Sequence, residues 1–196
     1  MAMLSTAGCG AGDPKEEPTP SPSSSSSPST PSDPSTQPGG PPVGWEDNYT
    51  ADEISAYEAA VARWKRYNEL TDPIYKAGKD TEKARDVIRE YEIQWQRAVN
   101  DLARYYDAGG LRNEVPPAPL WTQATSVAMN SDGTGTVVFE QCTDYRNVVV
   151  TKNGKPADGV VPEHPVTPLS VHMVKAKDHD WKVAELKLED KTSCAG

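Results

Sequence analysis

The strongest constraint on this chain is a stretch of 25 residues, 18–42, that contains no aliphatic or aromatic side chain. The stretch is built mainly from Ser and Pro, and ten of the 18 prolines of the chain lie before residue 45. Such a segment cannot bury enough apolar surface to offset the entropy lost on ordering it. We therefore expect residues 10–44 to be an extended, disordered linker and residues 45–196 to form a single domain.

The charge pattern argues against two classes of partner. The chain has a net charge of −9, and its 20 basic residues form no cluster. An acidic surface without a basic patch disfavours nucleic acid and anionic lipid as binding partners. No run of 18 apolar residues occurs, so we expect no membrane-spanning helix.

The first expected helix begins with a clear start signal. Thr50 followed by Glu53 has the spacing of a capping box, and apolar residues then recur at helical intervals over about residues 51–69. Thr50 also completes an Asn-Tyr-Thr glycosylation acceptor, but the capping role explains this residue without a sugar.

A second, longer helix is expected further along the chain. Pro73 is expected to break the chain after the first helix. Apolar residues at alternating spacings of four and three then extend from Ala84 to Tyr105, before Gly109-Gly110 ends the pattern. The sequence therefore predicts two main helices in the first half of the domain.

The second half of the domain has the pattern of antiparallel strands. After residue 119 the apolar residues alternate, and the pairs Asp132-Gly133 and Asn153-Gly154 are typical of hairpin turns. Five strands are expected, over residues 121–129, 134–142, 145–151, 169–175 and 181–188. The chain is therefore predicted to be an α+β domain in which the two helices pack on a curved antiparallel sheet of four or five strands.

Two of the three cysteines lie inside the domain. Neither Cys142 nor Cys194 belongs to a pattern with zinc-ligand spacing, so a metal site is a poor explanation for them. A Cys142–Cys194 disulfide is the preferred interpretation, and closing that loop is worth roughly 4 kcal/mol in chain entropy. The alternative is two buried free thiols.

The third cysteine follows small residues near the N-terminus. Residues 4–9, Leu-Ser-Thr-Ala-Gly-Cys, resemble the end of a bacterial lipoprotein signal peptide. The resemblance implies that Cys9 is the site of lipid attachment, so the Ser/Pro linker would hold the domain away from the membrane. Thr6 departs from the aliphatic residue usual there, and residues 1–8 lack basic and apolar regions, so we expect a longer leader in the exported precursor. The alternative is that Cys9 is incidental in a flexible tail.

The domain also resembles a known family. The segment VVFEQCTD at 137–144, the segment NGKP at 153–156, Trp181-Lys-Val and the terminal Cys194 look like those of small lipoproteins from high-GC Gram-positive bacteria, the actinobacteria, and their phages. The domain of those proteins resembles the cone-shaped fold of nuclear transport factor two, which ketosteroid isomerase and polyketide cyclases share. The resemblance covers residues 50–194 and implies a fold far better than a function.

We find no catalytic constellation in this sequence. The enzymes of the cone fold use a buried acid or histidine as general base, for which Asp144 and His172 are candidates, with Tyr57 and Tyr91 as possible donors. The alternation of the last strands, however, places His172 on the outer face, and Asp144 can cap the following turn. The expectation is therefore a protein that is not an enzyme and that uses no cofactor and no metal ion.

An aromatic stripe on the helices leaves one binding site possible. Trp64, Tyr91 and Trp95 are spaced so that they could line an apolar pocket, although residues at this spacing more often form ordinary core.

Two functions of different classes are consistent with these features. The first is a non-catalytic, surface-anchored lipoprotein that recognises a surface protein or a cell-wall component outside the membrane, for example in excluding a second phage if it is phage-encoded. The second is a cone that binds a small molecule or acts as an isomerase- or cyclase-like enzyme. An enclosed cavity of about 300 Å³ or more with an ionisable group favours the second function, and a filled core favours the first.

Overall fold

A computed structural model describes residues 40–157, 159, 162–189 and 193–194. The chain separates into two units, residues 1–35 and 36–196, and every described helix and strand belongs to the second. Cys9 and the linker up to residue 39 lie outside the described residues. Among the helices of the described part, none is both long and apolar enough to cross a membrane.

The first long helix begins where the sequence predicts. After a short 3₁₀ helix at Trp45–Asn48, helix α1 runs from Ala51 to Ala77. The hydroxyl of Thr50 accepts a hydrogen bond from the Glu53 amide at 3.3 Å, and the Glu53 carboxylate accepts one from the Thr50 amide at 2.8 Å. The predicted capping box is therefore confirmed.

The predicted break at Pro73 is wrong, because α1 continues through this residue for four more positions. Proline removes one backbone hydrogen bond and costs a helix about 3 kcal/mol. The continuation is held by packing, since Ile74 and Tyr75 contact a second apolar cluster around Ile88 and Leu102. Helix α1 ends instead at Gly78, whose φ of 57° suits glycine.

The second long helix is interrupted, in contrast to the continuous helix predicted. Helix α2 spans Glu82–Tyr91, α3 spans Trp95–Asp101, and a π-helical turn at Leu102–Asp107 follows directly. Between α2 and α3 the chain is extended: Glu92 forms a parallel bridge with Val183, and the Ile93 amide donates to the Val183 carbonyl at 2.9 Å. These residues cover part of the open edge of strand β7, which would otherwise expose unpaired backbone groups.

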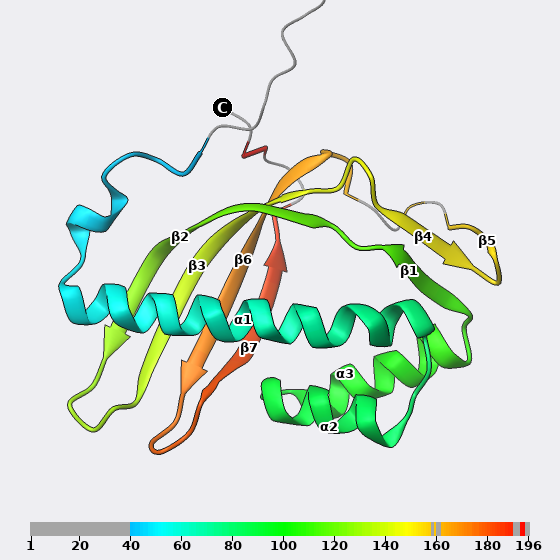
Figure 1. The fold of residues 1–196 in the computed structure, drawn as a ribbon, viewed down its shortest axis with the longest axis horizontal. Coiled ribbons are helices and arrows are strands. Elements are labelled where there is room, and N and C mark those ends of the chain that lie inside the picture. The colour runs from blue at the N-terminus through cyan, green and yellow to red at the C-terminus, as the bar shows by residue number, and fades with distance from the viewer. Residues whose placement is uncertain (1–39, 158, 160–161, 190–192, 195–196) are drawn as a thin grey trace, which may run out of the picture. The chain divides into compact units, whose positions relative to one another are not determined.

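The strands form two antiparallel sheets (Figure 1). The larger sheet has the order β2-β3-β6-β7, with strands Ala118–Met129, Gly135–Asp144, Val166–Lys175 and Trp181–Leu188. The smaller has the order β1-β4-β5, with strands Leu111–Val115, Val149–Lys152 and Lys155–Pro156. Strands β1 and β5 were not predicted, and the predicted strand over 145–151 corresponds to β4, which pairs with β1.

The two sheets are connected by a bend in the chain. β1 leads into β2 through Pro116 and Pro117, and β3 leads into β4 through a turn that starts at Tyr145. β1 pairs with β4, and β2 pairs with β3. The segment β1–β2 and the segment β3–β4 therefore run side by side and bend at the same level. The bend directs the smaller sheet away from the larger one.

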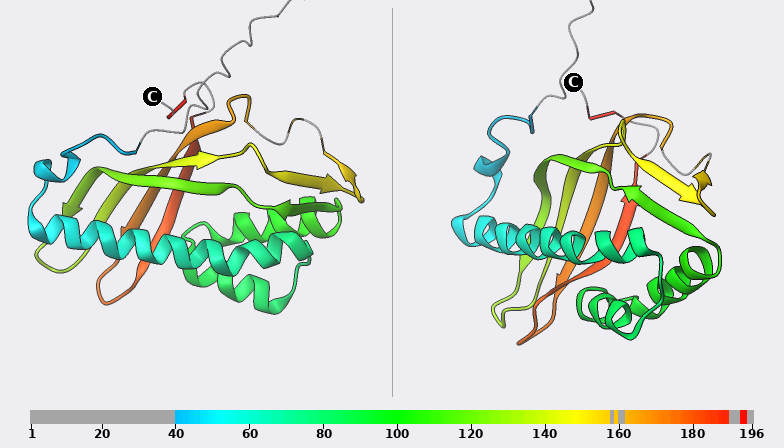
Figure 2. Two further views of the ribbon diagram at one scale, coloured as in Figure 1. Left: turned by 45° about the horizontal axis from the view of Figure 1, so that its top comes forward. Right: turned by 45° about the vertical axis from the view of Figure 1, so that its right-hand side comes forward.

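Helix α1 lies across the concave face of the curved larger sheet (Figure 2). The main core joins the inner face of α1 to the sheet; its fully buried strand residues are Val137, Phe139, Val171 and Met173. On the opposite face of β3, Cys142 is bonded to Cys194, with 5.9 Å between their Cα atoms. The α+β class and the Cys142–Cys194 pairing predicted from the sequence are therefore confirmed.

Candidate functional site

The apolar core stops part-way along the concave face of the sheet. On β3, the residues that face α1 are Val137, Phe139, Gln141 and Thr143, so this face changes from apolar to polar after Phe139. Beyond this point α1 and the sheet are no longer joined by interlocking apolar side chains. A space remains between them, bounded on its other side by the bend between the two sheets.

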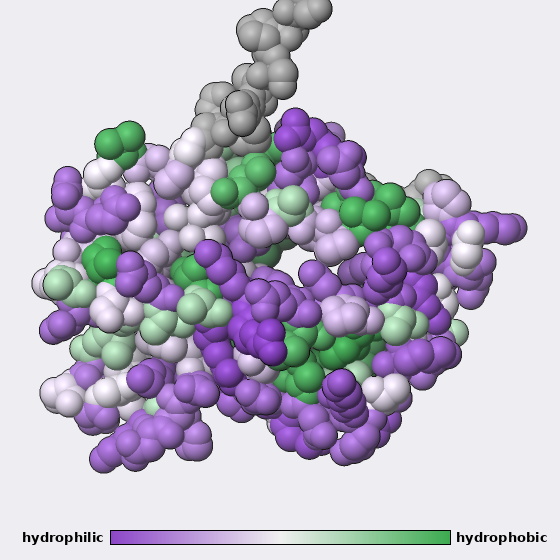
Figure 3. All heavy atoms as spheres, in the orientation of Figure 1, coloured by the Kyte–Doolittle hydropathy of each residue, from purple (hydrophilic) through white to green (hydrophobic). Residues whose placement is uncertain are grey.

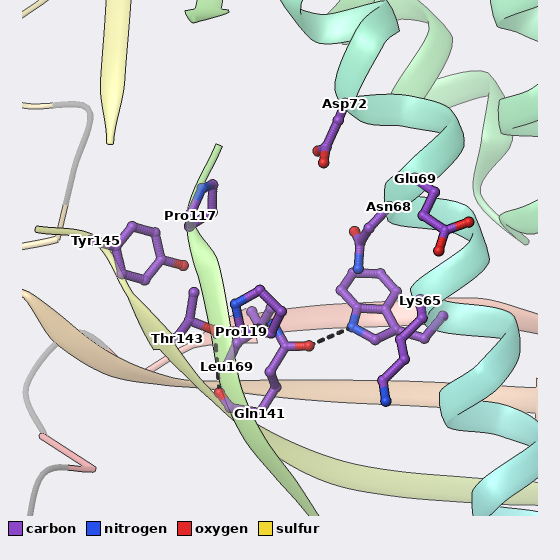
Figure 4. A pocket seen from close by; sticks show the side chains of 11 residues that line it. Lys65, Asn68, Glu69, Asp72, Pro117, Pro119, Gln141, Thr143, Tyr145 and Leu169 are labelled. Carbon is purple, nitrogen blue, oxygen red and sulfur yellow. Dashed lines mark hydrogen bonds between the residues drawn. The ribbon is translucent and has the colours of Figure 1, made fainter. Parts of the chain in front are cut away.

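This space, which we call the α1 cleft, is an open cavity of about 370 Å³. Figure 3 shows the molecular face hollowed between α1 and the segment that joins β1 to β2. Figure 4 shows how the lining residues from the helix and from the sheet face one another across it. The lining consists of Trp64, Lys65, Asn68, Glu69, Asp72, Pro117, Pro119, Gln141, Thr143, Tyr145 and Leu169.

The floor of the cleft is held by a buried hydrogen-bond chain. The indole nitrogen of Trp64 donates to the Gln141 side-chain oxygen at 2.8 Å, and the Gln141 amide donates to the Thr143 hydroxyl at 3.0 Å (Figure 4). All three side chains are buried. Because buried polar groups are costly to leave unpaired, this chain fixes the orientation of each side chain. The floor is therefore preorganised.

The α1 rim of the cleft carries four polar residues. Glu69 is paired with Arg66 at 2.9 Å, which neutralises its charge. Lys65, Asn68 and Asp72 have side chains that make no hydrogen bond or ion pair within the described residues. Desolvation by the surrounding protein raises the pKa of Asp72 above its ordinary value. These three groups are thus available to a ligand.

The opposite wall is mainly apolar. Pro117 and Pro119 present rigid ring surfaces from the bend, and the Tyr145 ring lies beside them with its hydroxyl toward the cleft (Figure 4). Burial raises the pKa of the Tyr145 phenol. The Arg146 guanidinium holds the neighbouring Asp144 carboxylate through a hydrogen bond of 2.6 Å, which stabilises the turn that carries Tyr145.

The structure does not bring the three predicted pocket residues together. Trp64 lines the α1 cleft. Tyr91 lies in the main core, where it stacks on Tyr67 with ring centroids 5.6 Å apart and lies under the Arg63 guanidinium at 3.7 Å. Trp95 belongs to the second apolar cluster, around Leu102. The apolar pattern of the sequence continues from Tyr91 to Trp95, but the helix itself is interrupted between α2 and α3. The spacing of these two residues therefore does not place them on one helical face.

The catalytic candidates do not form one site, and Tyr57 and Asp144 are already hydrogen-bonded. The Tyr57 hydroxyl donates to Thr122 at 2.8 Å. Asp144 accepts hydrogen bonds from the Arg146 amide and guanidinium, which lowers the pKa of this carboxyl and makes it a turn-capping residue. His172 alternates with the buried Val171 and Met173, so it lies on the other face of the sheet from α1. Among the described residues, no group of three His, Cys, Asp or Glu side chains could hold a metal ion.

A second, more polar cavity of about 550 Å³ lies between α3 and β7. Glu92 contributes to its lining, and its carboxylate accepts a hydrogen bond from the Tyr67 hydroxyl. Burial raises the pKa of Glu92, and nearby Asp101 acts in the same direction. Since the backbone of Glu92 also bridges to β7, this residue joins α1, the α2–α3 connection and the sheet. Its contacts indicate a structural role.

Sequence reasoning missed most of the residues that form the α1 cleft. Lys65, Asn68 and Asp72 look like a solvated helix face, and Pro117 and Pro119 look like a linker between elements. One signal was present: the inward positions of β3 change from apolar to polar at Gln141 and Thr143. In a strand that is buried on one face, such a change marks the end of the packed core.

No protein-family model and no curated protein matches this sequence. The interpretation of the α1 cleft therefore depends on its own geometry and chemistry.

Proposed function

We propose that this protein is a tethered, extracytoplasmic binding module that is not an enzyme and that binds its ligand in the α1 cleft. The observation that carries this proposal is the combination of a fixed floor, built from Trp64, Gln141 and Thr143, with unpaired polar groups on the rim. Ligand sites in proteins are typically concave, apolar and preformed, with a few polar groups that orient the ligand. The α1 cleft has each of these properties.

The proposed location outside the cytoplasm has two supports. A Cys142–Cys194 disulfide is compatible with an oxidising compartment, since such bonds are rare in the cytosol. The resemblance of residues 4–9 to a lipoprotein signal supplies the proposed anchor, Cys9, and the Ser/Pro linker supplies the reach from the membrane. In this proposal the domain has the cone fold of the nuclear-transport-factor-two family and meets a surface protein or a cell-wall component.

Binding is favoured over catalysis by the positions of the ionisable groups. Asp144 is neutralised by Arg146, and His172 lies on the face of the sheet opposite the cleft. General acid–base catalysis needs such a group within hydrogen-bond reach of the substrate. Of the two carboxylates that line the cleft, Glu69 is paired with Arg66, and Asp72, which has no partner among the described residues, lies at the rim. The cleft is open, and not the enclosed cavity that would favour a small-molecule or enzymatic cone, so we assign it a recognition role.

The cleft assignment is tested by blocking it. The full chain would be titrated with a set of amino acids, short peptides, monosaccharides and aromatic acids while the backbone amide resonances are recorded by NMR. At least one compound should shift the resonances of Asn68, Gln141 and Tyr145, and Leu169→Trp should abolish that shift by filling the cleft. His172→Trp is the matched control, because it adds the same ring to the same strand on the opposite face. Cleft shifts unaffected by Leu169→Trp, or their absence with the whole set, would refute the assignment.

The anchor is tested separately in cells. Expression from the native locus, followed by fractionation and intact-mass measurement, should give a membrane-bound species that begins at a lipidated Cys9. Cys9→Ser should remove the lipid and the membrane association. A cytosolic wild-type species that retains Met1 and free thiols would contradict both the anchor and the location.

A further inference from the structure

The two unpaired charges at the rim of the α1 cleft have opposite sign. Lys65 and Asp72 are seven residues apart on α1, which is close to two turns, so both side chains lie on the same face of the helix. Seven residues correspond to about 10.5 Å along the helix axis. Figure 4 shows the two side chains at opposite ends of the rim, with Asn68 between them. A ligand that satisfies both charges must carry a positive and a negative group at a separation of this order.

A short extended peptide has this charge arrangement. Its backbone advances about 3.3–3.6 Å per residue, so three residues place the α-ammonium and the terminal carboxylate roughly 10 Å apart. Between its charged ends a peptide presents amide donors and acceptors. The Asn68 amide on the rim and the Tyr145 hydroxyl on the opposite wall are the matching free groups of the cleft. The spacing of the charges and the polar groups of a short peptide therefore match those of the cleft.

Beside its polar floor, the cleft offers an apolar contact on strand β6. Leu169 lines the cleft, and on the neighbouring strand β7 Leu188 pairs directly with it. Leu186 pairs with the core residue Val171 and so faces the same side of the sheet. Leu188 and Leu186 are 39% and 45% exposed, but neither lines the α1 cleft, and Leu186 lines the polar cavity between α3 and β7. Of these three leucines, Leu169 therefore is the one that offers a ligand in the α1 cleft an apolar contact.

We propose that the α1 cleft binds a short peptide of about three residues with free termini. Its α-ammonium group lies at Asp72, its terminal carboxylate at Lys65, and an apolar side chain rests on Leu169. This inference rests on the proposed function, because it names the ligand class of the same cleft. The flat wall of Pro117 and Pro119 leaves room for the backbone and forms no further charged contact.

The direct probe is the tripeptide Ala-Leu-Ala with free termini, titrated into the full chain by NMR and calorimetry. Saturable binding with shifts at Asn68, Gln141 and Tyr145 is expected. Acetylating the amino end or amidating the carboxyl end should each weaken binding about fivefold, the change expected for one solvent-accessible ion pair. The dipeptide Ala-Leu should also bind more weakly, because it cannot reach both charges. Capped peptides that bind as tightly as the free one would overturn the proposal.

The orientation of the peptide is tested by pairing protein and ligand changes. Asp72→Asn should weaken binding of the free peptide about fivefold and leave binding of the acetylated peptide unchanged. Lys65→Gln should likewise weaken binding of the free peptide about fivefold and leave binding of the amidated peptide unchanged. Glu58→Gln and Lys76→Gln are matched controls, because both are exposed residues of α1 outside the lining of the cleft. An equal loss for free and capped peptides would contradict the assigned contacts.

The outcome separates this inference from the proposed function. If Ala-Leu-Ala produces no cleft shifts while another compound of the set does, and Leu169→Trp abolishes those shifts, the peptide assignment is wrong and the binding function stands. If Leu169→Trp changes no interaction of the protein, the function and the peptide assignment both fail.

Discussion

Breaking the Cys142–Cys194 bond should remove about 4 kcal/mol from the free energy of unfolding. The bond joins residues 52 positions apart, and the chain-entropy relation gives this value for a loop of that length at 25 °C. For a domain of about 150 residues each kcal/mol shifts the melting temperature by about 2–4 °C, so the loss corresponds to roughly 8–16 °C. Cys194→Ser is the preferred change, because it leaves the Cys142 sulfur in its buried position.

The assay is urea denaturation of the wild-type protein, the reduced wild-type protein and Cys194→Ser, followed by tryptophan fluorescence and far-UV circular dichroism. The reduced protein and the variant should agree with each other. Because the bond mainly restricts the unfolded chain, their denaturant slope should be larger than that of the oxidised protein. The NMR resonances of the cleft residues should change little, since Cys142 points away from Gln141 and Thr143. A loss below about 1 kcal/mol, with an unchanged slope, would refute the loop-closure reasoning.

Three further outcomes follow from individual contacts. Gln141→Ala leaves the buried indole N–H of Trp64 without its acceptor and should cost about 1–3 kcal/mol in urea denaturation. Thr50→Ala removes the cap that accepts from the Glu53 amide and should cost about 1 kcal/mol by the same measurement. Burial raises the pKa of Glu92 above 4.5, so its stabilising contribution is complete below that pH and is lost as the pH rises through the raised pKa. The stability of Glu92→Gln should therefore match the wild type at acidic pH and exceed it at neutral pH, whereas parallel pH profiles would contradict a raised pKa.

Local patterns were sufficient to predict much of this fold. The Thr50 capping box, the turns at Asp132-Gly133 and Asn153-Gly154, and the strands of the larger sheet each depend on residues close in sequence. The Cys142–Cys194 pairing was predicted because few alternatives exist for two cysteines in one domain.

The wrong predictions share a tertiary cause. Pro73 lowers helix propensity locally, but packing of the following turn against the second apolar cluster keeps α1 intact. The interruption between α2 and α3 occurs because Glu92 and Ile93 pair with the edge of β7, a strand about 90 residues later in the sequence. Neither effect is visible in a window of a few residues. Strand β1 was missed for a similar reason, since its partner β4 lies beyond an entire hairpin.

The α1 cleft could not be predicted because it is formed by surfaces that do not pack. Lys65 and Asp72 have the spacing of any exposed helix face, and only the bend at Pro117 and Tyr145 turns that face into one wall of a cavity. The change from Phe139 to Gln141 along β3 predicts where the core ends. It does not predict what lies above the polar residues.

The part of the larger sheet that α1 leaves uncovered indicates that the cleft has been retained for binding. Leu169, Leu186 and Leu188 face the same side of the sheet as the buried Val171, and covering them with a longer apolar helix face would add stability. The chain instead places Lys65, Asn68 and Asp72 on the helix across the cleft from Leu169 and fixes the floor with the Trp64–Gln141 hydrogen bond. Leu169→Trp should therefore leave the domain at least as stable as the wild type while it removes binding. A protein in which filling a cavity does not lower stability but abolishes recognition has kept that cavity for its ligand.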